Sequence, residues 1–176
     1  MKQNPDKMVE ALDFAIRFER EGKEFFEEAA KITNNSLGKD VFRTLAEEEN
    51  VHMNKIMEVY QNLEKKGKWE ERITVVGNPD RLKTVFAGAM EKIDKDIKVS
   101  TSDLEALKKA MELEQRGQKL YNGLAEKAAD PLEKRFHLTL ATEERGHFLL
   151  ILDSYDYLSD PSGWFAQKER SLLDGG

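Results

Sequence analysis

The feature that most restricts the fold of this chain is a short motif, Glu-x-x-His, that occurs twice. Glu49 and His52 lie in the segment EEENVHMNKI, and Glu144 and His147 lie in TEERGHFLLI, 95 residues further on. Apolar residues flank each motif at helical spacing, so its Glu and His share the helix face that should be buried. A chain that places a carboxylate and an imidazole among core positions needs a reason to bury them.

The offset of 95 residues extends well beyond these two motifs. It pairs Glu19 with Glu114 and Gly22 with Gly117. Further pairs at the same offset are Glu10 with Glu105, Leu12 with Leu107, Ala15 with Ala110, Phe26 with Tyr121, Leu45 with Leu140 and Tyr60 with Tyr155. The chain therefore contains an internal duplication, and each half has the apolar pattern of two helices joined by a short link.

The pattern predicts an all-α four-helix bundle made of two repeated hairpins in a single domain, 1–176. The first hairpin is expected over about 5–66 and the second over about 102–158. The connection, 67–101, is expected to contain an extended stretch, Ile73-Thr74-Val75-Val76, and a short amphipathic helix, Arg81 to Lys98. The tail, 159–176, carries Trp164 and Phe165, which we expect to dock on the bundle or on a second subunit.

Residues that start and stop helices set the expected boundaries. Thr33-Asn34-Asn35 favours a turn between the first two helices, and Gly67 is a suitable residue to end the second. Ser102 and Glu105 have the spacing of a capping box at the start of the third helix. Asp130-Pro131 favours the start of the fourth helix, which we expect to stop before Pro161.

Composition excludes several classes of function. The net charge of −6 argues against a nucleic-acid partner. The chain has no cysteine, which removes disulfides, thiol nucleophiles and iron–sulfur centres. It also lacks both an apolar signal segment near the start and a run of the ~20 apolar residues that a membrane span needs. We therefore expect a soluble, cytoplasmic protein without a membrane partner.

The helix stripes place polar ligands at the centre of the expected bundle. Glu19 occupies a core slot between Ala15 and Gly22, and Glu114 occupies the equivalent slot in the second half. Together with the two motifs, four Glu and two His would point into one bundle. Four buried carboxylates carry a charge of roughly −4, which two divalent metal ions would balance, and carboxylate with imidazole suits such ions.

The chain resembles the ferritin-like superfamily and, within it, rubrerythrin-type proteins. The motifs that carry the resemblance are EREGKEFF and EQRGQKLY in the first and third helices, with EENVH and EERGH in the second and fourth. The resemblance implies a di-iron centre, with Mn as an alternative metal. It further implies that Glu19 and Glu114 are terminal ligands, that Glu49 and Glu144 bridge the metals, and that His52 and His147 each complete one metal site.

A rubrerythrin-type protein would be a di-iron oxidoreductase that reduces hydrogen peroxide or O₂, with ferroxidase activity as a further expectation. Rubrerythrins typically carry an extra carboxylate one turn after the third-helix Glu, where this chain has Gly117, and that departure favours oxidase or ferroxidase chemistry over peroxide reduction. The usual rubredoxin domain is also missing, so an external electron donor is expected. The expected oligomer is a homodimer.

Other functions remain open at this stage. They are iron binding and storage, a dimanganese catalase-like enzyme, a hydroxylase or radical role, and a non-catalytic bundle that keeps its ligands by descent. His137 lacks a Glu three residues upstream, so it is interpreted as a surface or boundary residue. Tyr121 could donate a hydrogen bond to a ligand or pass an electron. Because its repeat partner Phe26 has no hydroxyl, we favour the interpretation of Tyr121 as a packing residue with one polar tip.

Overall fold

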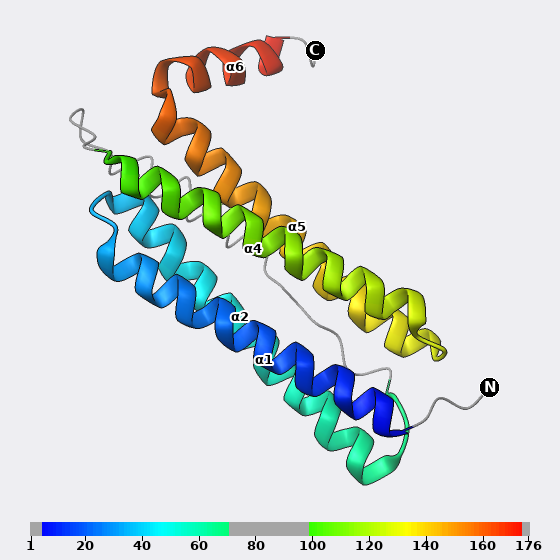
Figure 1. Cartoon of the computed structure of the whole chain (residues 1–176). Helices are drawn as coiled ribbons and strands as arrows, with labels where there is room; N and C mark the ends of the chain where they lie inside the picture. Colours follow the sequence, from blue (N-terminus) through cyan, green and yellow to red (C-terminus); the bar gives the residue numbers. More distant parts are fainter. Residues whose placement is uncertain (1–4, 71–98, 174–176) are drawn as a thin grey trace.

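The chain forms a bundle of long antiparallel helices in the computed structural model, which describes residues 5–70 and 99–173 (Figure 1). Its elements are α1 (Pro5–Ile32), α2 (Ser36–Lys66), α4 (Thr101–Lys127), α5 (Pro131–Ser159) and α6 (Pro161–Leu173). α1 packs along α2 and α4 packs along α5, so the two predicted hairpins are confirmed. The hairpins meet through α2 against α5 and α1 against α4. No strand occurs in the described ranges, and the all-α fold is confirmed.

The ends of the helices follow local capping chemistry. The Asn35 side chain accepts a hydrogen bond from the backbone N–H of Gly38 at 3.1 Å at the start of α2. Gly67 ends α2 with φ of 65°, a left-handed conformation that suits glycine. Asp130 caps α5, and Pro131 is its first residue. These three boundaries agree with the sequence prediction.

The predicted capping box at the start of the third helix is wrong by two residues. α4 is capped by Ser100, whose side chain accepts from the backbone N–H of Asp103 at 3.2 Å. The Asp103 carboxylate accepts in return from the backbone N–H of Ser100 at 3.0 Å. Asp103 also accepts from the backbone N–H of Asn34, which lies in the link between α1 and α2. This contact between the hairpins favours the earlier start.

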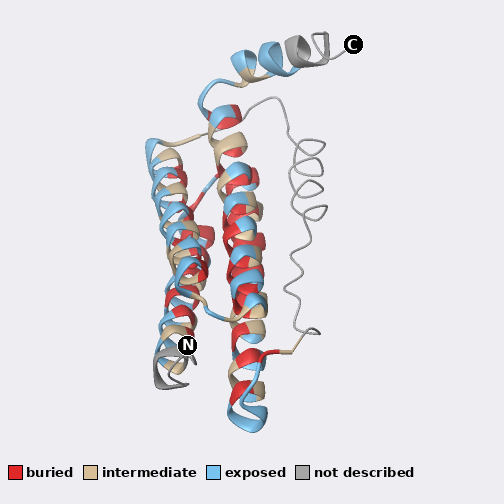
Figure 2. Ribbon diagram, turned by 90° about the vertical axis from the view of Figure 1, so that its right-hand side faces the viewer, coloured by how far each residue is buried: buried red, intermediate tan, exposed pale blue. Residues whose placement is uncertain are grey.

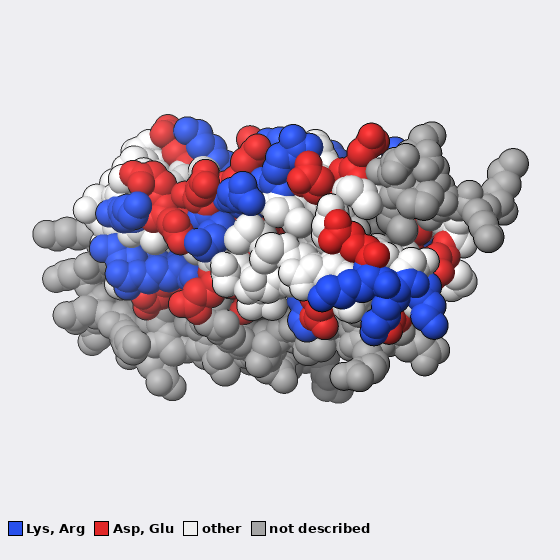
Figure 3. Space-filling view, turned by 90° about the horizontal axis from the view of Figure 1, so that it is seen from below, with Lys and Arg blue, Asp and Glu red and all other residues white. Residues whose placement is uncertain are grey.

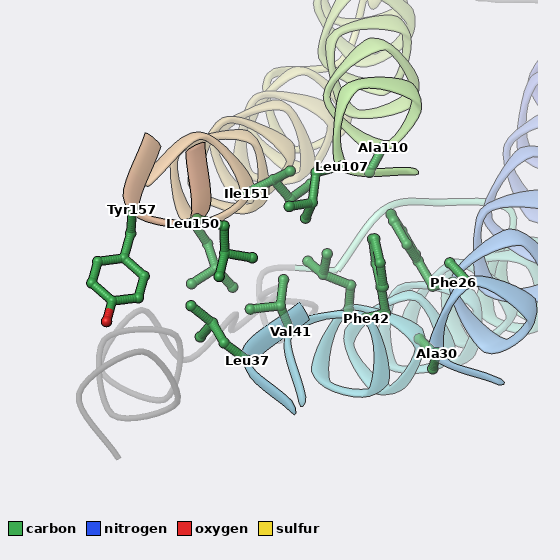
Figure 4. Packing of buried hydrophobic residues seen from close by; sticks show 14 residues of the cluster. Phe26, Ala30, Leu37, Val41, Phe42, Leu107, Ala110, Leu150, Ile151 and Tyr157 are labelled. Atoms are coloured by element: carbon green, nitrogen blue, oxygen red, sulfur yellow. The ribbon is translucent and has the colours of Figure 1, made fainter. Parts of the chain in front are cut away.

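Two apolar clusters fill the bundle, one on each side of its middle. The cluster near the α1–α2 turn includes Phe26, Phe42, Leu107 and Ile151, which come from four different helices and point toward one another (Figure 4). The second cluster lies toward the other end and includes Leu12, Ile56, Tyr121 and Leu140. Buried positions follow the facing sides of the helices in Figure 2. The middle of the bundle, between these clusters, holds the polar residues described below.

The tail forms a helix, α6, that turns away from the end of α5 (Figure 1). The Trp164 ring packs against Tyr157 with centroids 5.4 Å apart, and its Nε1–H donates to Asp153 at 2.9 Å. The Phe165 ring also packs edge-on against Tyr157, with centroids 6.0 Å apart, although this side chain is 47% exposed. The expected docking of the tail on the bundle is therefore seen for both aromatic residues. The predicted extended stretch at 73–76 and short helix at 81–98 lie outside the described residues.

The surface carries both signs of charge. Lys and Arg side chains alternate with Asp and Glu over the described part of the face in Figure 3. Several of these charges form i,i+3 or i,i+4 pairs along single helices, such as Lys23 with Glu27 at 3.0 Å. None of the described helices is long and apolar enough to span a membrane.

Candidate metal centre

Six polar side chains converge in the layer between the two apolar clusters. They are Glu19, Glu49, His52, Glu114, Glu144 and His147, and none is more than 3% exposed. α1 and α4 each contribute one carboxylate, while α2 and α5 each contribute a Glu and a His three residues apart. The structure thus brings together all six residues that the repeat pattern singled out. It does so because each residue continues the buried stripe of its helix.

The six residues form two overlapping groups, each compact enough to hold one metal ion. One group is Glu19, Glu49, His52 and Glu144, and the other is Glu49, Glu114, Glu144 and His147. Within each group the candidate ligand atoms all lie within 4.8 Å of one another. Two carboxylates, Glu49 and Glu144, belong to both groups. Three carboxylates and one imidazole around each position suit a hard to borderline divalent cation.

The two histidines, which are related by the internal repeat, have equivalent surroundings. Their rings stack with centroids 5.3 Å apart and planes at 18°. Nδ1 of His52 lies 3.1 Å from Glu19 and 3.3 Å from Glu144. Nδ1 of His147 makes the equivalent approaches, 3.4 Å to Glu114 and 3.8 Å to Glu49. Both imidazoles therefore turn Nδ1 toward the carboxylates.

Three of the four buried carboxyl groups have raised pKa values and therefore tend to stay protonated. Burial is the largest cause that raises the pKa of Glu19, Glu114 and Glu144, and the charge on Glu49 raises each of them further. The pKa of Glu144 reaches about 8. Without a cation, the site therefore lowers its negative charge by protonation.

Glu49 and His52 behave in the opposite way. Burial would raise the pKa of Glu49, but the adjacent Glu19 and His52 side chains and the charges of both histidines lower it to about 2. Burial would lower the pKa of His52, but the charge of Glu19 and a hydrogen bond to Glu143 raise it well above the ordinary 6.5. A cationic imidazole next to an ionised carboxylate thus occupies the centre of the site.

Several buried ligand atoms have no hydrogen-bond partner among the described residues. They are Oε2 of Glu49, both carboxylate oxygens of Glu114, Oε1 of Glu144 and Nδ1 of His147. Buried polar atoms are nearly always partnered, so a group of unpartnered acceptors at one point requires an explanation. The donor set, its burial and these unpartnered atoms fit divalent metal ions.

The repeated glycines lie against the two shared carboxylates. A Cβ built on Gly22 would lie 3.6 Å from Cδ of Glu49, an ordinary contact. A Cβ built on Gly117 would lie 2.8 Å from Cδ of Glu144, closer than real Cβ atoms pack, and 3.1 Å from the Phe18 ring, which is a tight contact. The glycines therefore make room for the carboxylates, and the requirement is stricter at Gly117.

Tyr121 is more than a packing residue. It is fully buried, and its hydroxyl donates a hydrogen bond to Oε1 of Glu19. Its repeat partner, Phe26, is equally buried but has no hydroxyl, and both oxygens of Glu114 lack a partner in the described structure. The two halves of the site thus differ in how their outer carboxylates are held.

The interpretation of His137 as a surface or boundary residue is wrong. His137 is 2% exposed, and its ring stacks on Tyr121 with centroids 6.3 Å apart and planes at 17°. The rings of Trp69 and Phe136 pack against it as well. Burial lowers the pKa of His137 to about 4, so the imidazole is neutral. Its i−3 residue could not reveal this, because two of the three aromatic neighbours, Tyr121 on α4 and Trp69 beyond the end of α2, lie outside its own helix.

Sequence reasoning did not single out Glu143, whose Oε2 accepts from Nε2 of His52 at 2.9 Å. A signal was present, since adjacent glutamates precede both histidines. Glu48 and Glu143 are related by the offset of 95 residues.

The fold and this site define a class, the ferritin-like bundles whose centre holds carboxylate and histidine ligands. The rubrerythrin family model matches residues 10–101, more than half of the 176 residues. The chain belongs to the rubrerythrin family. The matched range covers most of the first hairpin and ends where α4 begins, so the second hairpin lies outside it.

One solved structure extends the likeness to the whole fold. It is a hypothetical protein, Pfu-1136390-001, from Pyrococcus furiosus, with a TM-score of 0.61 and 23% sequence identity. The superposition covers 85% of this chain and 89% of that one. At this identity the likeness concerns the fold alone. No curated protein matches the sequence.

Proposed function

We propose that the chain binds two iron ions in the buried site and acts as a non-haem di-iron oxidoreductase. Its substrate would be hydrogen peroxide or O₂, with oxidation of Fe²⁺ as an accompanying activity. The observation that carries this proposal is the pair of overlapping ligand groups that share Glu49 and Glu144. Two metal positions with two common carboxylates are what a metal pair requires, whereas a single ion would need only one group.

Each ligand has a distinct role in this proposal. Glu49 and Glu144 would bridge the two ions, with Glu19 and His52 completing one position and Glu114 and His147 the other. Bound iron would supply the change of oxidation state and the open coordination positions that an oxygen substrate needs. The four carboxylates would balance the charge of two divalent ions, and the two apolar clusters limit the access of water to the layer.

The surroundings of Gly117 support O₂ reduction or ferroxidase activity over peroxide reduction. The extra carboxylate expected in a rubrerythrin would stand at this position. Here the Glu144 carboxylate and the Phe18 ring occupy the adjoining space, so even a Cβ is too close. A fifth carboxylate at this place, which would be the seventh ligand of the site, would require Glu144 to move.

The remaining features of the proposal concern partners. The chain has no cysteine for a rubredoxin-type centre, so electrons would come from a separate donor. We further propose a homodimer in the cytoplasm.

The experiment that tests the function combines metal analysis with reactivity. Protein prepared without chelator or affinity metal would be analysed for its elements, then reduced without oxygen and mixed separately with peroxide and O₂. About two irons per chain with oxidation faster by O₂ than by peroxide would support the preferred reading. Faster oxidation by peroxide would favour a peroxidase despite Gly117.

Other outcomes would redirect or end the proposal. About two manganese ions per chain would favour a catalase-like enzyme, and a large iron-filled assembly would favour storage. A protein that takes up neither iron nor manganese would be a bundle with relic ligands.

A further inference from the structure

We propose that Glu143 is a positioning residue of the metal centre, which holds His52 so that Nδ1 faces the metal. The inference rests on the proposed metal site. Nε2–H of His52 donates to Oε2 of Glu143 at 2.9 Å. On the opposite side of the ring, Nδ1 lies 3.1 Å from Glu19 and 3.3 Å from Glu49. The two nitrogens of one imidazole thus face different partners, and only Nδ1 faces the cluster.

The hydrogen bond to Glu143 selects the form of His52 that a metal needs. An imidazole that binds a metal through Nδ1 must carry its remaining proton on Nε2. A carboxylate acceptor at Nε2 favours this tautomer, fixes the rotation of the ring and makes Nδ1 a stronger ligand. The side chains of His52 and Glu143 are only 1% and 12% exposed, so water competes little for this bond.

The position of Glu143 on α5 makes this arrangement specific. Glu143 directly precedes Glu144, and side chains of successive helical residues point about 100° apart. One carboxylate therefore reaches Nε2 of His52 while the next reaches Nδ1, at 2.9 Å and 3.3 Å. His52 belongs to α2, so two neighbouring residues of the second hairpin hold an imidazole of the first.

The internal repeat provides independent support. Glu48 is the repeat partner of Glu143 and directly precedes Glu49, and it is only 4% exposed. Both halves of the chain therefore place an additional carboxylate within the bundle immediately before a shared carboxylate. A glutamate with a purely solvating role would lie on the outer face.

The test measures binding of Zn²⁺, a redox-inert probe, to Glu143→Ala, Glu143→Gln and the wild type. Removal of an outer carboxylate typically lowers metal affinity on the order of 10- to 100-fold, and we expect this loss for Glu143→Ala. Glu143→Gln keeps an oxygen that can accept from Nε2–H, so its affinity should lie between the other two. Glu112→Gln removes the same charge from an exposed position on α4 and should bind as the wild type does.

A second readout reports the hydrogen bond itself. In zinc-loaded protein with ¹⁵N-labelled histidine, the chain has only three imidazoles to assign. The Nε2 proton of His52 should exchange slowly in the wild type and rapidly in Glu143→Ala, while the signals of His137 stay unchanged. Circular dichroism would establish that the variants keep their helical content.

The outcomes separate this inference from the proposed function. Wild-type affinity and a protected Nε2 proton in Glu143→Ala would overturn the role of Glu143. Reduced affinity with an unchanged Nε2 proton, or an equal loss in Glu112→Gln, would also overturn it, because the effect would then be structural or due to net charge. A wild type that binds no divalent metal would overturn the metal centre, and this inference with it.

Discussion

At the scale of single residues, the duplicated site is close to symmetric but not equivalent in its two halves. Tyr121 donates to Glu19, whereas Phe26, its repeat partner, cannot donate to Glu114. The glycines differ as well, since a methyl group at Gly117 would displace the Glu144 carboxylate, whereas one at Gly22 would only make ordinary contact with Glu49. Two metal positions built from the same ligand types should therefore bind with different affinities.

Tyr121→Phe tests the contribution of the phenol. Loss of one buried hydrogen bond costs about 1 kcal/mol, which corresponds to a roughly fivefold weaker binding step. We expect this loss in one of two steps of a calorimetric metal titration, and the other step should change little. Tyr60→Phe removes a hydroxyl from outside the site and serves as the control. Equal weakening of both steps in Tyr121→Phe would contradict the assignment to the Glu19 half.

The two glycines form a matched pair for a steric test. Gly22→Ala should be neutral or stabilising by up to about 1 kcal/mol, because alanine favours the helix and its Cβ has room. Gly117→Ala should instead destabilise by about 1–3 kcal/mol and weaken metal binding, because Glu144 or Phe18 must move. Denaturant unfolding and metal titration would measure both. Wild-type metal affinity in Gly117→Ala would mean that Glu144 leaves this place when metal binds.

At the scale of helices and their ends, local sequence rules placed most boundaries but put the start of the third helix two residues too late. The stretch from Ser100 to Glu105 contains two overlapping capping-box patterns, Ser100 with Asp103 and Ser102 with Glu105. The structure uses Ser100 and Asp103, and Asp103 is 2% exposed. Its bond to the backbone of Asn34 connects the first hairpin to the start of the second.

Substitution of the two candidate acids discriminates between these capping boxes. Asp103→Ala removes the bonds to the backbone of Ser100 and Asn34, and we expect a loss of about 1–2 kcal/mol in unfolding free energy. Glu105→Ala alters an exposed side chain and should change stability by less than about 0.5 kcal/mol. Thermal or urea unfolding of the metal-free protein gives both values. The reverse order would restore the start predicted from Ser102.

At the scale of the whole molecule, a polar layer interrupts the core and joins the two hairpins. Each shared carboxylate comes from a different hairpin, Glu49 from α2 and Glu144 from α5. Metal bound in this layer would therefore link both halves of the fold, and the apolar clusters on either side would support it.

Metal removal should lower the stability of the whole bundle. Ligand that binds only the folded state contributes about 4 kcal/mol when present at 1,000 times its dissociation constant. Chelated protein should therefore unfold at a lower temperature than reloaded protein, and the difference should grow with metal concentration. Scanning calorimetry at several metal concentrations would measure this shift. A melting temperature independent of metal would contradict a site shared by both hairpins.

The pH dependence of stability should contain a contribution from His137. Below pH 6.5 the unfolded chain protonates this residue, whereas the folded chain keeps it neutral down to its pKa of about 4. The free energy of unfolding therefore begins to fall near pH 6.5, and the loss of about 3 kcal/mol is complete near pH 4. His137→Phe lacks this titrating group. The wild type should therefore lose more stability than the variant as pH falls from 7 to 4. Parallel pH profiles of the two metal-free proteins would show that His137 is not buried as a neutral residue.

The sequence by itself determined the helical class, the two hairpins and the six residues of the candidate centre. It could do so because helical periodicity fixes which residues share a face, and the repeat revealed polar residues such as Glu19 and Glu114 on buried faces. Only the tertiary structure decided which side chains meet between helices. Three contacts show this: the bond from Tyr121 to Glu19, the packing of Trp69 on His137, and the bond between His52 and Glu143. In each of them the two residues lie 68 or more positions apart in the sequence. Such contacts depend on how the hairpins dock. A local pattern such as the adjacent glutamates before each histidine can mark a candidate residue, but it does not say which side chain of another helix that residue will meet.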